Sequence, residues 1–98
     1  MSALTKKSDT HEERYVHLKV EGHPRVQMIT VFAREMVPGI WATSVAFCHV
    51  DDVFVRRIGR QIARRRFFHG TETRPVLDSA KFTFEAASKV ALTMLARL

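Results

Sequence analysis

The chain has 98 residues, of which 46% are hydrophobic and 27% charged, and this composition predicts one soluble globular domain with a single core. Only 4 glycines and 3 prolines are present and no long apolar run occurs, which excludes wholesale disorder and a membrane-spanning segment. Sixteen Lys and Arg against ten Asp and Glu give a net charge of +6, which indicates an acidic partner, most commonly nucleic acid.

Residues 1–13 are polar and show no periodicity, so we expect a flexible N-terminal tail followed by a single α+β domain over residues 14–98. The tail lacks the apolar stretch of a signal peptide. Cys48 is the one cysteine, which excludes a disulfide scaffold and favours a reducing compartment. The sequence therefore predicts a cytoplasmic protein.

Three consecutive segments alternate with the period of two that is typical of half-buried strands: residues 15–20, 25–35 and 40–48. Turn-forming residues separate them. Residues 21–24 contain glycine and proline, and Pro38-Gly39 suits the centre of a type II turn. Short turns between consecutive strands predict an antiparallel meander.

The third predicted strand has two unequal faces. One is bulky and includes Trp41 and Phe47, whereas the other carries small side chains from Ala42 to Cys48. Because small side chains allow a close approach, we expect the following helix to pack on that face. The bulky face then needs separate cover, from the C-terminal helix or from a second subunit.

A basic helix is predicted next, over about residues 52–66. Asp51 suits an N-cap position, and Asp52 suits the positive first turn. The apolar stripe expected on this helix is Phe54, Ile58 and Ile62. Gly59 costs about 1 kcal/mol in a helix interior relative to alanine, so it indicates close packing. We expect its packing partner to be one of three small side chains, Ala42, Ala46 or Cys48.

A loop is expected over residues 71–77, with Pro75 as its breaker, and then a second helix with Thr83 as its N-cap. The apolar face of this helix is Phe84, Ala87, Val90, Ala91, Met94, Leu95 and Leu98. Residues 81–84 alternate and also fit a short fourth strand, an alternative that the sequence leaves open. The predicted fold is thus α+β with the order β-β-β-α-α.

The basic helix holds six arginines and no lysine. Six positive and two negative charges over residues 51–66 leave +4 of the net +6 in this segment. The candidate binding residues are Arg56, Arg57, Arg60, Arg64, Arg65 and Arg66. Guanidinium groups suit bidentate contacts to phosphates or carboxylates, whereas lysine would serve solubility equally well. The pattern favours a site for nucleic acid or an acidic protein surface over the alternative of a solvated helix face.

No other constellation carries recognisable chemistry. The histidine and cysteine spacings match no metal site, and no phosphate loop or nucleophile motif is present, so we expect no metal, no cofactor and no enzymatic activity. Cys48 as a nucleophile would need a base and an orienting group, and the adjacent His49 is the one candidate base in the sequence. Tyr15 and Trp41 would stack bases on an exposed sheet, and Phe67-Phe68 would anchor a protein partner, but core positions are more typical of such side chains.

Residues 26–66 resemble small uncharacterised proteins encoded by bacteriophages and prophages. The resemblance rests on a strand that ends in Ala46-Phe47-Cys48, the pair Asp51-Asp52, and a helix with Gly59-Arg60 and Ile62-Ala63. It implies a phage source and an accessory role inside the bacterial host cell, and it transfers no activity. The expected function is a non-enzymatic nucleic-acid-binding protein; the alternative is an anti-CRISPR-like inhibitor that binds a host protein or defence complex.

A homodimer is an expected companion to either role. The sheet and the C-terminal helix offer more apolar surface than one helix–sheet interface uses.

Overall fold

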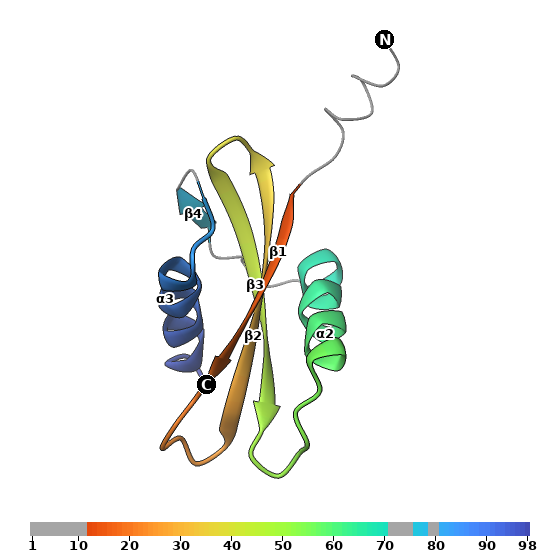
Figure 1. The fold of residues 1–98 in the computed structure, drawn as a ribbon, viewed down its shortest axis with the longest axis vertical. Coiled ribbons are helices and arrows are strands. Elements are labelled where there is room, and N and C mark those ends of the chain that lie inside the picture. The colour runs from red at the N-terminus through yellow and green to blue at the C-terminus, as the bar shows by residue number, and fades with distance from the viewer. Residues whose placement is uncertain (1–11, 71–75, 79–80) are drawn as a thin grey trace.

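The computed structural model describes residues 12–70, 76–78 and 81–98 (Figure 1). In chain order its elements are β1 (Glu13–Lys19), β2 (Val26–Val37), β3 (Ile40–His49), α2 (Arg56–His69), β4 (Val76–Asp78) and α3 (Phe84–Leu95). Figure 1 shows the sheet from its edge, with α2 on one face and α3 on the other. The predicted α+β class and the order of its main elements are confirmed. None of the helices in the described ranges is long and apolar enough to cross a membrane.

The four strands form one antiparallel sheet in the order β1-β2-β3-β4. Tyr15 pairs with Phe32, which pairs in turn with Ser44. Gly39 has a φ of 84°, the left-handed conformation that the predicted β2–β3 turn requires. The alternation of the three long strands therefore predicted which side chains share a face.

The fourth strand lies elsewhere than expected. The alternative of a strand at residues 81–84 is wrong, because Thr83 caps α3 by accepting a hydrogen bond from the backbone N–H of Ala86. Val76 and Leu77, assigned from sequence to the loop 71–77, instead pair with β3 as part of β4. Pairing with β4 satisfies backbone N–H and C=O groups at the start of β3. Because the partner strand is distant in sequence, the residues of β4 carry little local pattern that would predict a strand. Residues 71–75 of the expected loop lie outside the described residues.

One face of the sheet is an aliphatic core closed by α3. Its buried members are Val26, Ile29, Val31, Val45, Ala87, Val90 and Ala91. Trp41 extends this face, with its ring centroid 5.8 Å from that of Phe82. The C-terminal helix thus covers the bulky face, one of the two covers expected. Phe84 and Leu98 remain 65% and 56% exposed because they lie at the two ends of the C-terminal segment.

The other face packs against α2, as the small side chains of β3 predicted. The buried members of this core are Phe32, Ala42, Ala46, Ala63 and Phe67. The Ser44 hydroxyl donates a hydrogen bond to the backbone oxygen of Ala63 across the interface. A Cβ atom on Gly59 would lie 2.5 Å from Thr30 Oγ1, so the close approach is real. Its partner is Thr30 of β2, and the predicted partner among Ala42, Ala46 and Cys48 is wrong.

The start and the orientation of α2 differ from the prediction. The helix begins at Arg56, and Val55 occupies its N-cap without a side-chain hydrogen bond, so Asp51 is not the cap. The side chains buried against the sheet are Ala63 and Phe67, whereas Ile58 is 46% exposed. The expected stripe is therefore wrong as a buried face, because Phe54 precedes the helix and Ile58 is exposed; Ile62 alone is partly buried against this core. Of the predicted tail, residues 1–11 lie outside the described residues, and Glu13 opens β1.

Candidate functional site

Three arginines of α2 lie along β1 at four-residue spacing: Arg56, Arg60 and Arg64. Three alternate residues of β1 lie near them: Glu13, which pairs with Arg64, Tyr15, whose ring lies under Arg60, and His17, whose pKa the charge of Arg56 lowers. Four helical residues rise about 6 Å and two strand residues about 6.6 Å, so the two rows stay in step along their length. We call these arginines the β1-facing row.

Phe68 anchors the end of this row. The Arg64 and Arg34 guanidinium carbons lie 4.7 and 5.2 Å from the centroid of the Phe68 ring. Glu13 bridges the same two arginines, with Oε2 2.9 Å from Arg34 Nη1 and Oε1 3.3 Å from Arg64 Nε. The ring and the carboxylate hold both guanidinium groups in place, while Phe68 itself stays 42% exposed.

Tyr15 lies below the next arginine of the row. The Arg60 guanidinium carbon is 6.0 Å from the Tyr15 ring centroid, and the ring packs 5.1 Å from Phe32. Burial raises the pKa of Tyr15, and the nearby Glu13 carboxylate raises it further. Trp41 is only 2% exposed. The base-stacking alternative for Trp41 is therefore excluded by burial, and Tyr15 is covered by an arginine.

His17 occupies the third position below the row. Its Nδ1 lies 2.8 Å from Thr30 Oγ1, and its ring meets Phe54 edge-on at 5.3 Å. Burial lowers the pKa of His17, and the positive charges of Arg56 and Arg60 lower it further. The imidazole is therefore neutral at neutral pH, and its ring contacts the segment that precedes α2.

The remaining arginines point in two other directions. Arg57 and Arg65 are exposed on the side of α2 away from the sheet, with the exposed Gln61 between them. Neither makes a hydrogen bond or ion pair with the rest of the described residues. Their eight-residue separation corresponds to about 12 Å along the helix. We call these two arginines the outer row.

Arg66 lies on the side of α2 that faces β3, and its Nη1 donates to the backbone oxygen of Val45 at 3.4 Å. The six predicted site residues therefore lie on one helix but in three groups. Within the described residues, the outer row combines exposure with the absence of a hydrogen bond or ion pair, and so does Arg56 at the start of the β1-facing row.

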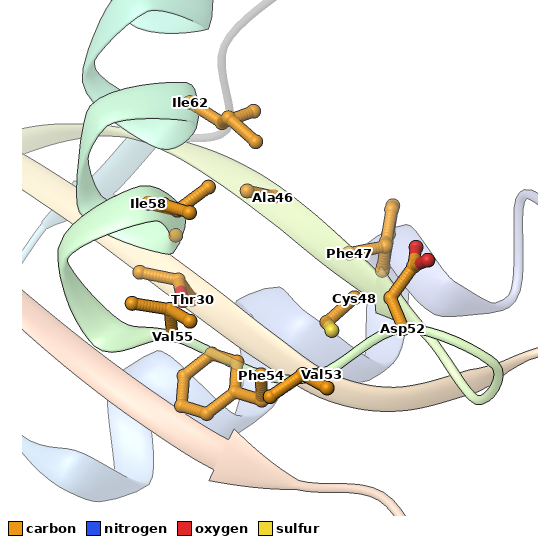
Figure 2. Close-up of a pocket in the computed structure, with 11 residues that line it drawn as sticks. Thr30, Ala46, Phe47, Cys48, Asp52, Val53, Phe54, Val55, Ile58 and Ile62 are labelled. Carbon is orange, nitrogen blue, oxygen red and sulfur yellow. The ribbon is translucent and has the colours of Figure 1, made fainter.

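A pocket of about 320 Å³ opens beside α2, between the helix and the end of β3 (Figure 2). Ile58 and Ile62 line it from the helix, Ala46 and Cys48 from β3, and residues 52–55 close one end. The lining is mainly apolar. The pocket was not predicted, because the expected apolar stripe placed both isoleucines against the core; the two valines before the helix, Val53 and Val55, were the available signal in the sequence.

The surroundings of Cys48 do not activate its thiol as a nucleophile. Burial raises the pKa of its thiol, and the Asp52 carboxylate raises it further, so the thiol stays protonated at neutral pH. The adjacent His49 is already in use, because its Nδ1 accepts the backbone N–H of Asp51 at 3.1 Å. His49 is therefore not positioned as a base for Cys48, and the alternative of a Cys48–His49 nucleophile is not supported.

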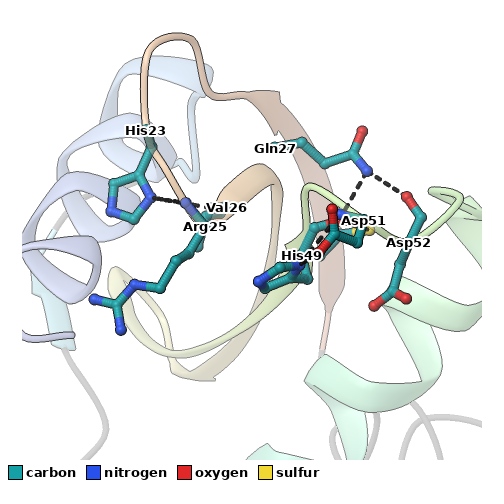
Figure 3. Close-up of polar contacts among 8 residues, drawn as sticks. His23, Arg25, Val26, Gln27, His49, Asp51 and Asp52 are labelled. Carbon is teal, nitrogen blue, oxygen red and sulfur yellow. Dashed lines mark hydrogen bonds and ion pairs between the residues drawn. The ribbon is translucent and has the colours of Figure 1, made fainter.

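Polar contacts hold the turn that follows β3 and explain the late start of α2 (Figure 3). Gln27 donates from Nε2 to the backbone oxygens of His49, at 2.9 Å, and of Asp52. These bonds fix Asp51 and Asp52 in a turn, so neither can cap the helix. His23 closes the β1–β2 turn in a similar way, with Nδ1 accepting two backbone N–H groups at 3.0 Å. In the described part of the chain, no three His, Cys, Asp or Glu side chains gather in a metal-binding group.

No family model, no curated protein and no solved structure matches this chain. The phage resemblance therefore stays a prediction.

Proposed function

We propose that this protein is a non-enzymatic nucleic-acid-binding protein whose contact surface is α2. The observation that carries the proposal is the charge of this helix: it has six arginines and no acidic residue. One carboxylate, that of Glu13, lies within ion-pair distance of any of them in the described residues. The surface over α2 is therefore strongly positive, as binding to a phosphate backbone requires.

The outer row supplies the contacts that cost least to form. Arg57 and Arg65 have no hydrogen-bond or ion-pair partner among the residues that the structure describes, so within these each can bind a phosphate without breaking an existing ion pair. The Gln61 amide between them can donate to a phosphate or a base edge. We infer that these three side chains lie closest to the nucleic acid.

The β1-facing row contributes position as well as charge. Arg60 and Arg64 are held over the Tyr15 and Phe68 rings, so less side-chain entropy is lost when they bind. Arg64 is partly neutralised by Glu13, which makes its contribution smaller than that of an unpaired arginine. Phe68 adds a half-exposed ring beside these guanidinium groups.

The test is fluorescence anisotropy with labelled duplex DNA, duplex RNA and single strands at increasing salt. For duplex DNA, log K should fall with log salt by about 0.9 per neutralised phosphate. The Arg57→Glu/Arg65→Glu variant should lose most of the affinity and flatten the slope. Lys89→Glu/Arg97→Glu is the matched control, because it makes the same change in net charge at exposed residues in and after α3. It should bind nearly as tightly as the natural chain.

Equal affinity at about 50 and about 300 mM salt would contradict the proposal. So would an equal loss of binding in the two charge-reversed variants. Capture of a host protein from nuclease-treated lysate, together with no binding to bare nucleic acid, would favour the inhibitor alternative. The phage source, the cytoplasmic location and the homodimer stay predictions.

A further inference from the structure

The two edges of the sheet differ in how they are protected. Along β1, charged residues interrupt the edge, and Arg14 and Lys19 form ion pairs with Glu12 and Glu21. Along β3, β4 pairs with residues 40–42 only. Within the described ranges no strand pairs with the outer side of residues 46–49, a stretch without Asp, Glu, Lys, Arg, proline or glycine. Edges without such protection are the ones that pair with other chains.

The apolar surface of the molecule continues from this edge onto α2. Val53 is 88% exposed, Val55 40% and Ile58 46%. Figure 2 places these side chains and Ile62 around the pocket that opens beside residues 46–48 of β3. We call these four side chains and the pocket the edge patch. Contiguous exposed apolar surface of this kind marks an interaction site.

We propose that the edge patch is the interface between two copies of this chain. In the proposed dimer a two-fold axis runs perpendicular to the sheet beside Ala46. The ends of the two β3 strands lie antiparallel across this axis, and the two α2 helices pack side by side on the same face of the joined sheet. The inference goes beyond nucleic-acid binding and does not depend on it.

The spacing of helix and strands fits this arrangement. α2 lies over β2 and β3, so its axis is about one strand spacing from the proposed two-fold axis. With strands about 4.8 Å apart, the two helix axes would be about 10 Å apart, within the range of packed helices. Gly59 packs on Thr30, which pairs with Ala46, so the neighbouring Ile58 lies at the level of the axis. The exposed Ile58 of each copy would therefore meet the other.

The charges at the two ends of the edge patch are also complementary. α2 runs antiparallel to β3, because Gly59 lies at the level of Ala46 and Ala63 at that of Ser44. Arg66 is thus about 10 Å from the axis in one direction along the helix, and the turn with Asp52 starts about 10 Å away in the other. The two-fold rotation places Arg66 of each copy near Asp52 of its partner. The Asp52 carboxylate has no ion-pair partner within the described part of its own chain.

Sedimentation velocity on the full chain without nucleic acid tests the proposal. The natural chain should sediment as a species of twice its 11.3 kDa mass. Ile58→Glu should convert it to a monomer, because a carboxylate would be buried against its own symmetry mate. Leu92→Glu is the matched control: Leu92 is an apolar residue on α3 with 66% exposure, and this variant should remain dimeric.

Exchanging the charges of Asp52 and Arg66 distinguishes the loss of an intermolecular contact from misfolding of the chain. Asp52→Arg should weaken association at least tenfold, because the new positive charge would lie near Arg66 of the partner subunit. The added change Arg66→Asp should restore association. A monomeric natural chain at its highest soluble concentration would overturn the proposal and leave the pocket to a different occupant. Equal dissociation by Ile58→Glu and Leu92→Glu would also overturn it. Because no nucleic acid is present, these outcomes say nothing against binding by the outer row.

Discussion

The two faces of the sheet are built from the same strands but differ in chemistry. Ile29 and Val31 point into a closed aliphatic core under α3, and Thr30 and Phe32, their neighbours in sequence, point toward α2. The α2 face combines aromatic rings, arginines and a pocket, and its helix lies close enough for Gly59 to touch Thr30. The α3 face therefore provides stability, whereas the α2 face holds polar and charged groups in defined positions.

The charge distribution follows the same division. α2 has six arginines and no acid, whereas α3 has Glu85 in its first turn and no basic residue in its last. Clustering arginines on a helix raises its repulsion energy, and the structure offsets part of this with Glu13 and with ring contacts. A cost of this kind is expected where a surface binds a charged partner.

The largest effect is expected when one large side chain is removed from each face of the sheet in turn. Phe32→Ala and Ile29→Ala should each lower the free energy of unfolding, by about 3–5 and about 2–5 kcal/mol. Phe32 lies 5.1 Å from the Tyr15 ring and 6.4 Å from the Phe68 ring, so its loss also releases the rings that hold Arg60 and Arg64. Urea unfolding measures the stability, and anisotropy at low temperature measures binding by the folded fraction.

Only Phe32→Ala should weaken nucleic-acid binding beyond the effect of unfolding. Ile29→Ala is its control, since Ile29 is 1% exposed and belongs to the α3 core. If both variants lose binding in proportion to stability, the two faces are not functionally distinct.

A smaller effect is expected from filling the close contact between α2 and the sheet. Gly59→Ala gains about 1 kcal/mol of helix propensity, but the new methyl group would meet Thr30 Oγ1, which is fully buried. Because overpacking costs about 1–3 kcal/mol, we expect a net loss of about 1 kcal/mol in the free energy of unfolding. Chemical denaturation measures it.

The double variant Gly59→Ala/Thr30→Ala provides the control for that contact. Removal of the hydroxyl makes room for the methyl group, so the two changes together should cost less than the sum of the single changes. Strict additivity would show that the contact is not the source of the strain.

The strands and their faces were predictable because successive side chains of a strand point to opposite faces, a local pattern that turn residues at both ends delimit. Thr83 was predictable as a cap for the same reason, since its partner Ala86 lies three residues away. Asp51 has the same chemistry but a different outcome. Its turn is held by Gln27, a residue from another strand that no local pattern relates to it.

The candidate site was predictable in part. The arginines are visible in the sequence, but their division into rows depends on which side of α2 meets the sheet. That orientation depends on contacts with the sheet, among them Gly59 on Thr30 and Ala63 on Ser44, and one consequence is an exposed Ile58. The edge patch was not predictable, because it arises where a rotated helix, a late helix start and a short β4 coincide.

The smallest expected effect is the pH dependence contributed by His17 on the α2 face. Its pKa is lowered by burial and by Arg56 and Arg60, so near its ordinary pKa the folded protein binds this proton less readily than the unfolded chain. The free energy of unfolding should therefore fall as the pH drops below about 6.5, until the folded protein also takes up the proton.

His17→Asn, which retains a partner for the Thr30 hydroxyl, should show a smaller loss between neutral and mildly acidic pH in urea titrations. His69→Asn, at the exposed last residue of α2, controls for removal of an imidazole and should keep the full loss. Equal pH dependence in the natural chain and His17→Asn would mean that the folded and unfolded states bind the His17 proton equally well, which would contradict the lowered pKa.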